Sequence, residues 1–187
     1  MKTKDLAYVA LFAAVTAVLG LVPGISVGPV PITAQTLGVM LAGSVLGARR
    51  GLLALALFLV LVAIGLPLLP GGRGGLAVFA GPTAGFLLSW PVGAFVVGLL
   101  TEWSWARYTL ARALVANAVG GILVVYLIGV PVLAWVNALP LGTAIGVGAL
   151  PFLPGDAVKA VVASVVAVQV RRSWPVIERP HRAAASR

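Results

Sequence analysis

The stretch Pro151-Phe152-Leu153-Pro154-Gly155-Asp156-Ala157-Val158-Lys159, with the apolar run that follows it to about Val170, decides how this chain folds. Asp156 follows Pro-Gly and precedes the apolar run, which is the position of a helix N-cap whose carboxylate accepts from free backbone N–H groups. Lys159 comes three residues later and therefore shares a helix face with Asp156. An apolar helix that begins with an acid and a base indicates a membrane helix with a polar site at its start.

Two interpretations of this pair are open from the sequence. Asp156 could simply cap the helix while Lys159 extends to the lipid headgroups, as charges near the end of a membrane helix commonly do. The scarcity of acids favours a binding site, because the chain has only four acidic residues and Asp5, Glu102 and Glu178 lie at the edges of apolar segments. We therefore expect Asp156 and Lys159 to contact one ligand together.

The composition excludes a soluble domain. Hydrophobic residues make up 61% of the chain and charged residues 9%, whereas about a quarter of a soluble domain is charged. A chain of 187 residues accommodates about six spans of about 20 residues each. We predict an all-α integral membrane protein, a single transmembrane domain that is a bundle of six helices and has no room for an ATPase module.

Catalytic chemistry is poorly represented. Cysteine is absent and His181 is the single histidine, so we expect no disulfide, no metal site and no cofactor. No G-x-x-x-x-G-K-[ST] phosphate loop occurs, and no serine has a histidine partner within the apolar segments. We expect the protein not to be an enzyme.

The apolar runs and the Pro- and Gly-rich stretches between them predict where the helices lie. We interpret the first run as a retained helix, because no A-x-A-like cleavage site follows it. Residues 129–151 are rich in Gly and Pro and predict a re-entrant or surface segment with a short helix at 132–138, although an interrupted span is also possible. The expected helices cover residues 6–22, 32–46, 52–66, 83–100, 108–128 and 155–170, and residues 171–187 form a cytoplasmic tail.

The distribution of positive charge predicts the topology. Of the 13 Lys and Arg residues, only Arg73 falls on the side opposite the termini, and Lys159 is embedded. Positive charge accumulates on cytoplasmic loops, so both termini are expected in the cytoplasm, and the net charge of +9 needs no nucleic acid to explain it. Asp156, Lys159, the loop around Arg73 and the loop before Gln35 then meet in one outward-facing pocket.

Other residues are weaker candidates. Gln35 and Thr36 begin the second helix, and the Gln35 amide could bind a ligand or a neighbouring helix. Asn117 is expected to be buried midway along the fifth helix. Ala10 and Ala14 form a small-residue face that lets another helix approach, either within the bundle or on a partner.

Several motifs together are similar to the BioY family, the biotin-specific S component of energy-coupling factor (ECF) vitamin transporters. The similarity extends over about residues 5–170, with the motifs in the family's order. The motifs are Pro29-Val30-Pro31-Ile32-Thr33-Ala34-Gln35-Thr36-Leu37-Gly38-Val39-Met40-Leu41-Ala42-Gly43, Gly47-Ala48-Arg49-Arg50-Gly51, Ile64-Gly65-Leu66-Pro67, Gly72-Arg73-Gly74-Gly75, Gly81-Pro82-Thr83-Ala84-Gly85 and Pro151 to Lys159.

The resemblance implies a multi-pass subunit of a prokaryotic cell membrane that binds biotin at its extracellular side. A transmembrane T component and two ATPase subunits would drive uptake, with Ala10 and Ala14 docking on the T component. The family's Asp-x-x-Lys falls on Asp156 and Lys159 as ligand-binding groups. One departure is Phe86, where the family pattern leads to Tyr. Further candidates for the biotin site are Gln35, Thr36, Asn117, Arg73, Phe86 and Trp90.

The chemistry of biotin suits these residues. Its carboxylate requires a cation, and its ureido ring offers two N–H donors and one carbonyl acceptor. The sequence leaves open which end of biotin meets Asp156 and which meets Lys159. Two alternatives also stand at this stage: an S component for another small vitamin, and a channel or structural membrane protein with a buried Asp–Lys pair.

Overall fold

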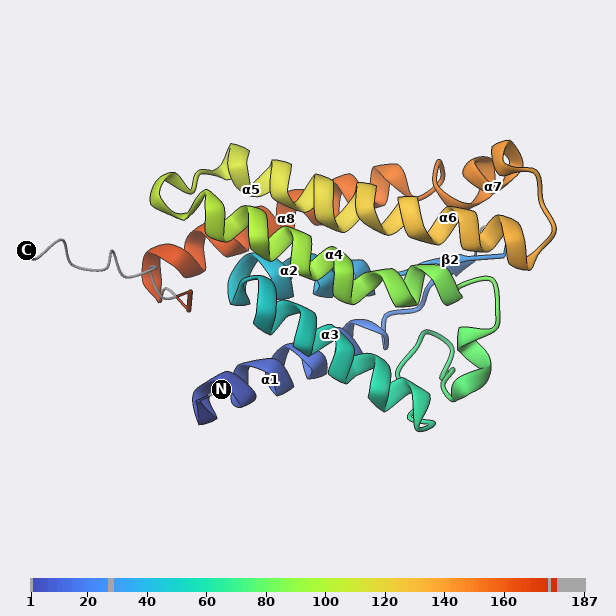
Figure 1. Ribbon diagram of the computed structural model, residues 1–187, viewed down its shortest axis with the longest axis horizontal. Coiled ribbons are helices and arrows are strands. Elements are labelled where there is room, and N and C mark those ends of the chain that lie inside the picture. Colours follow the sequence, from blue (N-terminus) through green and yellow to red (C-terminus); the bar gives the residue numbers. More distant parts are fainter. Residues whose placement is uncertain (1, 27–28, 175, 178–187) are drawn as a thin grey trace, which may run out of the picture.

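A computed structural model describes residues 2–26, 29–174 and 176–177 of the chain. Within these residues the fold is a bundle of long helices whose connections are mostly short (Figure 1). The expected tail at 171–187 lies largely outside the described residues. The long helical segments are α1 (Thr3–Leu19), α2 (Gln35–Leu46), α3 (Ala48–Ala63), α4 (Ala84–Trp103), the continuous run of α5 (Leu110–Asn117), η3 (Ala118–Val124) and α6 (Val125–Val136), and α8 (Leu153–Ser173).

Successive long segments run in alternating directions (Figure 1). The start of α1 and the end of α8 therefore lie at one end of the bundle, and the start of α8 lies at the other. α4 is central, because it packs against α2, α3, α6 and η3. Gly43 of α2 permits the close approach, since a Cβ there would lie only 2.5 Å from the Ala94 carbonyl oxygen and 2.6 Å from Val97.

The fifth helical segment is longer than the sequence pattern predicts. It continues without interruption from Leu110 to Val136, a run of 27 residues, whereas we expected it to end at residue 128. Pro131 lies inside the helix. Proline removes one backbone hydrogen bond, but ending the helix in an apolar environment would leave several backbone groups without partners, which costs more free energy. The short helix expected at 132–138 is wrong in position: the short helix is α7 (Leu141–Gly148).

The connection between α2 and α3 is tighter than expected. Gly47 has φ +86 and makes the reversal alone, because glycine adopts this conformation without steric cost. Glu102 Oε1 accepts from the backbone N–H of Ala48 at 2.8 Å, which satisfies one free donor at the start of α3. Arg49 and Arg50 consequently lie in the first turn of α3, which begins at Ala48 and not at residue 52 as expected.

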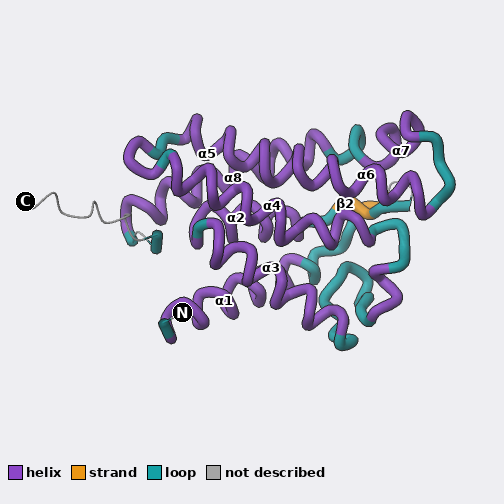
Figure 2. The backbone as a smooth tube through the Cα atoms, viewed as in Figure 1, coloured by secondary structure: helices purple, strands orange, loops and turns teal. Residues whose placement is uncertain are grey.

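The loops at the end of the bundle opposite the termini are structured (Figure 2). β1 (Ile25–Ser26) pairs antiparallel with β2 (Pro31–Ile32) in the loop between α1 and α2. Between α3 and α4, Leu69 and Arg73 form an isolated bridge, and the 3-10 helix η1 (Leu76–Phe79) follows. These segments cover one end of the helices and leave room for a site there.

The surface of the bundle suits a lipid environment. In the described residues, three helices are long and apolar enough to cross a membrane: Ala84–Trp103, Leu110–Val136 and Leu153–Ser173. Large apolar side chains point outward from α1 and α8, including Leu11, Val18, Val158 and Val165. Exposed apolar surface of this extent is typical of a protein that spans the bilayer.

Candidate functional site

The first turn of α8 brings Asp156 and Lys159 together, as their spacing predicts. Lys159 Nζ lies 2.8 Å from Asp156 Oδ1. Asp156 is not the helix cap, however, and that prediction is wrong, because α8 already begins at Leu153. Pro154 is tolerated in this first turn, where a backbone N–H would have no acceptor within the helix. The backbone N–H of Asp156 donates to the Phe152 carbonyl at 2.8 Å. The carboxylate is therefore free to bond side chains of other helices.

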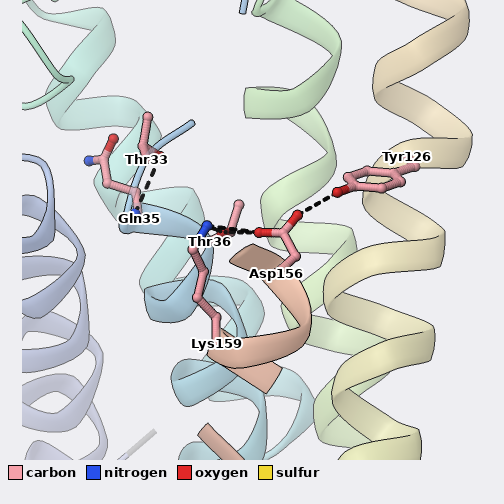
Figure 3. A network of polar contacts seen from close by, with 6 residues as sticks. All are labelled: Thr33, Gln35, Thr36, Tyr126, Asp156 and Lys159. Atoms are coloured by element: carbon pink, nitrogen blue, oxygen red, sulfur yellow. Dashed lines mark hydrogen bonds and ion pairs between the residues drawn. The ribbon is translucent and has the colours of Figure 1, made fainter. Parts of the chain in front are cut away.

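Two further helices supply partners for this pair (Figure 3). Thr36 of α2 donates its hydroxyl to Asp156 Oδ1 at 3.1 Å and accepts from Lys159 Nζ at 2.9 Å. Tyr126 of α6 donates its hydroxyl to Asp156 Oδ2 at 2.5 Å. We call Thr36, Tyr126, Asp156 and Lys159 the charged network.

The charged network has a buried carboxylate and half-buried partners, and it is not saturated. Asp156 is 2% exposed and accepts three hydrogen bonds, whereas an ionised carboxylate offers about four acceptor positions. Lys159 uses two of the three donors of an ammonium group. The network therefore retains both an acceptor and a donor for a ligand.

A cavity opens onto this network at the end of the bundle opposite the termini. Its walls come from α2, α4, α6, α8 and the two loops, and Phe86 and Trp90 supply apolar wall surface. Phe86 carries no hydroxyl, but Tyr126 brings a phenol from a different helix. The residues around the cavity are Val30, Pro31, Thr33, Gln35, Thr36, Leu69, Pro70, Arg73, Thr83, Phe86, Leu87, Trp90, Val125, Tyr126, Phe152, Asp156 and Lys159.

Two buried polar atoms at this cavity lack a partner among the described residues. Gln35 Oε1 is an acceptor and Trp90 Nε1 is a donor, and neither makes a hydrogen bond. A buried polar group without a partner costs about 1 to 3 kcal/mol, so an occupant that pairs with them gains that free energy. The cavity thus offers a ligand neutral polar contacts as well as charged ones.

Gln35 also holds the cavity wall in place. Its Nε2 donates to the Thr16 carbonyl at 3.1 Å and to the Leu68 carbonyl at 3.0 Å, which links α1 and the loop after α3. Arg73 lies on that loop, is exposed, and donates its Nε to the Pro70 carbonyl at 3.3 Å. Arg73 lines the cavity and makes no ion pair with a described residue.

Asn117 does not reach the cavity. Its Oδ1 accepts from Ser44 Oγ at 2.9 Å and its Nδ2 donates to Ser164 Oγ at 3.0 Å. Ser164 donates in turn to the Ala160 carbonyl at 2.6 Å. These residues, which we call the neutral network, join α2, α5 and α8 inside the bundle.

The sequence analysis missed Tyr126. It lies within the predicted fifth helix and belongs to no motif, so its position in the sequence indicates only a membrane helix. One feature could have identified it: a phenol needs a hydrogen-bond partner when buried among apolar residues. In the structure that partner is Asp156.

The alanine face of α1 points away from the bundle. Ala10 and Ala14 are exposed, whereas Val9 and Ala13 are buried against the other helices. The two alanines therefore do not mediate packing within this chain. The sequence left open packing within the bundle or on a partner, and the structure excludes packing within the bundle.

Comparison with known proteins agrees with this geometry. A protein-family model described as the BioY family matches residues 1–176. The chain belongs to the BioY family. It is 52% identical over 185 residues to the biotin transporter BioY of Rhizobium etli, across 95% of this chain and 98% of that protein. It is 42% identical over 175 residues to the probable biotin transporter BioY of Bacillus subtilis, across 92% and 93% of the two chains.

The BioY fold is also found among solved structures. A crystal structure described as the S-component for biotin from an ECF-type ABC transporter superposes with a TM-score of 0.86 and 34% identity. The match covers 92% of this chain and 95% of that chain. The resemblance inferred from the sequence motifs is therefore confirmed at the level of family and fold.

Proposed function

We propose that this chain is the biotin-binding S component of an ECF-type transporter and takes part in biotin uptake. The observation that carries the proposal is the unsaturated charged network at the cavity of a BioY family member. The family and the similar proteins are transporters, which gives no ground for assigning an enzymatic activity.

The arrangement of charges favours one orientation of biotin. Asp156 and Lys159 already neutralise each other, so a second full charge from the ligand gains little there. They do offer one acceptor and one donor, which match an N–H and the carbonyl of the ureido ring. Arg73 keeps an unpaired guanidinium at the opening, where it suits the carboxylate. We infer that the ureido ring lies at Asp156 and Lys159, and the carboxylate at Arg73.

The remaining candidates take neutral roles in this arrangement. Thr36 holds Lys159 against Asp156, and Phe86 and Trp90 flank the apolar part of the bicyclic ring. Gln35 Oε1 accepts a hydrogen bond from the ligand while its Nε2 positions the loop. Asn117 has no direct ligand contact in this proposal, because its amide is bonded within the neutral network.

We propose a topology of six spans with both termini in the cytoplasm of a prokaryotic cell. The alternating helix directions support it (Figure 1). Arg73 lies in the loop between α3 and α4, and among the other described basic residues only Lys159 shares that end of the bundle. The cavity then opens to the outside, where it captures biotin before transport.

Uptake requires partners in this proposal. A T component and two ATPase subunits supply the energy, and the exposed Ala10 and Ala14 face allows a helix of the T component to pack closely on α1. Ala14→Trp should leave biotin binding unchanged and prevent co-purification with a T component. A stable complex containing the Trp variant would remove this face from the docking surface.

Calorimetry of biotin binding to the detergent-purified protein tests the central proposal. We expect the wild type to bind biotin tightly and Lys159→Met to bind it with at least about 30-fold lower affinity, because removal of one member of a buried charged contact costs about 2 to 5 kcal/mol. Arg172→Gln, which removes an exposed charge from the other end of α8, is the matched control and should bind normally. If the folded wild type does not bind biotin but binds another vitamin in a competition panel, the substrate is that other vitamin.

A further inference from the structure

A second hollow lies at the end of the bundle opposite the biotin cavity, between the end of α4 and the start of α5. It has a volume of about 420 Å³, within the range of roughly 300 to 1,000 Å³ that ligand sites occupy. It shares no residue with the biotin cavity. We call it the α4–α5 groove; its lining residues are Leu100, Trp103, Ser104, Ala111, Arg112, Val115 and Ala116.

The interior of the groove suits hydrocarbon. Leu100 and Val115 form apolar walls, and Ala111 and Ala116 create the space because their side chains are small. The hydroxyl of Ser104 donates back to the Leu100 carbonyl at 2.8 Å, so it is already satisfied within its own helix. A polar solute would find little to bind there, whereas an acyl chain would lie against apolar surface.

The edge of the groove has a different character. Arg112 lies in the first turn of α5, is exposed, and makes no ion pair with an acidic side chain in the described part of the chain. Glu102 is close in sequence, but its Oε1 accepts from Ala48 on the α3 side. Trp103, at 88% exposure, stands beside the groove, as interfacial tryptophans do at headgroup level. The edge therefore combines an unneutralised cation with an interfacial aromatic ring.

We propose that the α4–α5 groove binds an anionic phospholipid of the cytoplasmic leaflet, with an acyl chain in the groove and the headgroup at Arg112. Basic pockets between membrane helices on the cytoplasmic side bind anionic headgroups in this way. The location in the cytoplasmic leaflet rests on the topology proposed above. The cation without a nearby acid is the reason to expect preference for a net negative headgroup over a zwitterionic one.

Native mass spectrometry of the purified full chain tests this proposal. The probes are phosphatidylglycerol and phosphatidylcholine with identical acyl chains, added in equal amounts. We expect the wild type to retain more phosphatidylglycerol than phosphatidylcholine. The amount of phosphatidylglycerol retained by Arg112→Gln should be about fivefold lower than that retained by the wild type. Arg49→Gln is the matched control, since Arg49 is exposed at the same end of the bundle but lies outside the groove. It should retain phosphatidylglycerol like the wild type.

A variant that fills the groove separates the two parts of the site. Ala111→Trp should reduce retention of both lipids, because it occupies the space of the acyl chain while leaving Arg112 in place. Equal loss in Arg112→Gln and Arg49→Gln would overturn the proposal in favour of general surface attraction, as would equal retention of the two lipids by the wild type. Biotin binding measured on the same samples should be unchanged, so a sample that retains lipid without binding biotin would count against the proposed function alone.

Discussion

The bundle contains two polar networks, one buried and one half-buried around a buried carboxylate, that differ in charge and in completeness. The charged network joins α2, α6 and α8 beside the cavity and centres on Asp156, while the neutral network joins α2, α5 and α8 around Asn117. In the neutral network each side chain bonds another member or its own helix. In the charged network, whose members line the cavity, one acceptor position of Asp156 and one donor of Lys159 are unused.

This difference shows how the same helices carry both structural and ligand-binding polar groups. α2 contributes Thr36 to the charged network and Ser44 to the neutral one, and α8 contributes Asp156 and Ser164. A closed neutral network links helices at little cost, because its polar groups satisfy one another. A buried ion pair adds little net stability, so its retention beside a cavity is better explained by binding. The two networks should respond oppositely to mutation.

The largest expected effect is on ligand binding in Asp156→Ala. Loss of the carboxylate leaves Lys159 uncompensated and removes the acceptor that we propose for the ureido N–H, so biotin affinity should fall at least about 30-fold. Calorimetry measures the affinity. The double variant Asp156→Ala/Lys159→Met is the decisive control, because it also removes the orphaned charge. Recovery of binding in the double variant would show that Asp156 acts only by neutralising Lys159.

The opposite behaviour is expected of Asn117→Ala. This change leaves the buried hydroxyl of Ser44 without its acceptor, and should lower the free energy of unfolding by about 1 to 3 kcal/mol. Thermal denaturation in detergent should show the loss, and calorimetry should show unchanged biotin affinity in the folded fraction. If affinity fell while thermal stability stayed the same, Asn117 would belong to the binding site and the contrast between the networks would be lost.

Tyr126→Phe sharpens the comparison within the charged network. It removes the donor to Asp156 Oδ2 but keeps the ring in the cavity wall. A hydrogen bond to a charged group contributes about 1.5 to 3 kcal/mol, so biotin affinity should fall about tenfold if the carboxylate needs this partner when the ligand is bound. Tyr8→Phe, on α1 and outside the cavity, controls for the loss of a phenol. Equal affinities of Tyr126→Phe and the wild type would make Tyr126 a part of the wall only.

The sequence predicts the local elements of this site better than its assembly. The spacing of Asp156 and Lys159 determines their contact within one turn, and the prolines and glycines mark the loops. Tyr126 of α6 lies inside the predicted fifth helix, but its contact with Asp156 depends on how α6 packs beside α8, which no local pattern contains. The local pattern also suggested a helix end near Gly129, where the apolar environment keeps the helix intact. Asn117 looked like Gln35 in the sequence, since both are lone amides in apolar segments. Only the packing of α2 against α8 separates them.

The smallest expected effect concerns the opening of the cavity. Arg73 is exposed, so the contact that we propose between it and the biotin carboxylate is screened by water and ions, and Arg73→Gln should weaken binding by no more than about fivefold. Biotinamide, which lacks the negative charge, provides a matched ligand. The wild type should bind biotinamide more weakly than biotin, and Arg73→Gln should bind the two ligands equally. The four affinities form a cycle that measures the interaction free energy between Arg73 and the carboxylate. If Lys159→Met instead of Arg73→Gln abolished this discrimination, the carboxylate would lie at the charged network and the orientation of biotin in the cavity would be reversed.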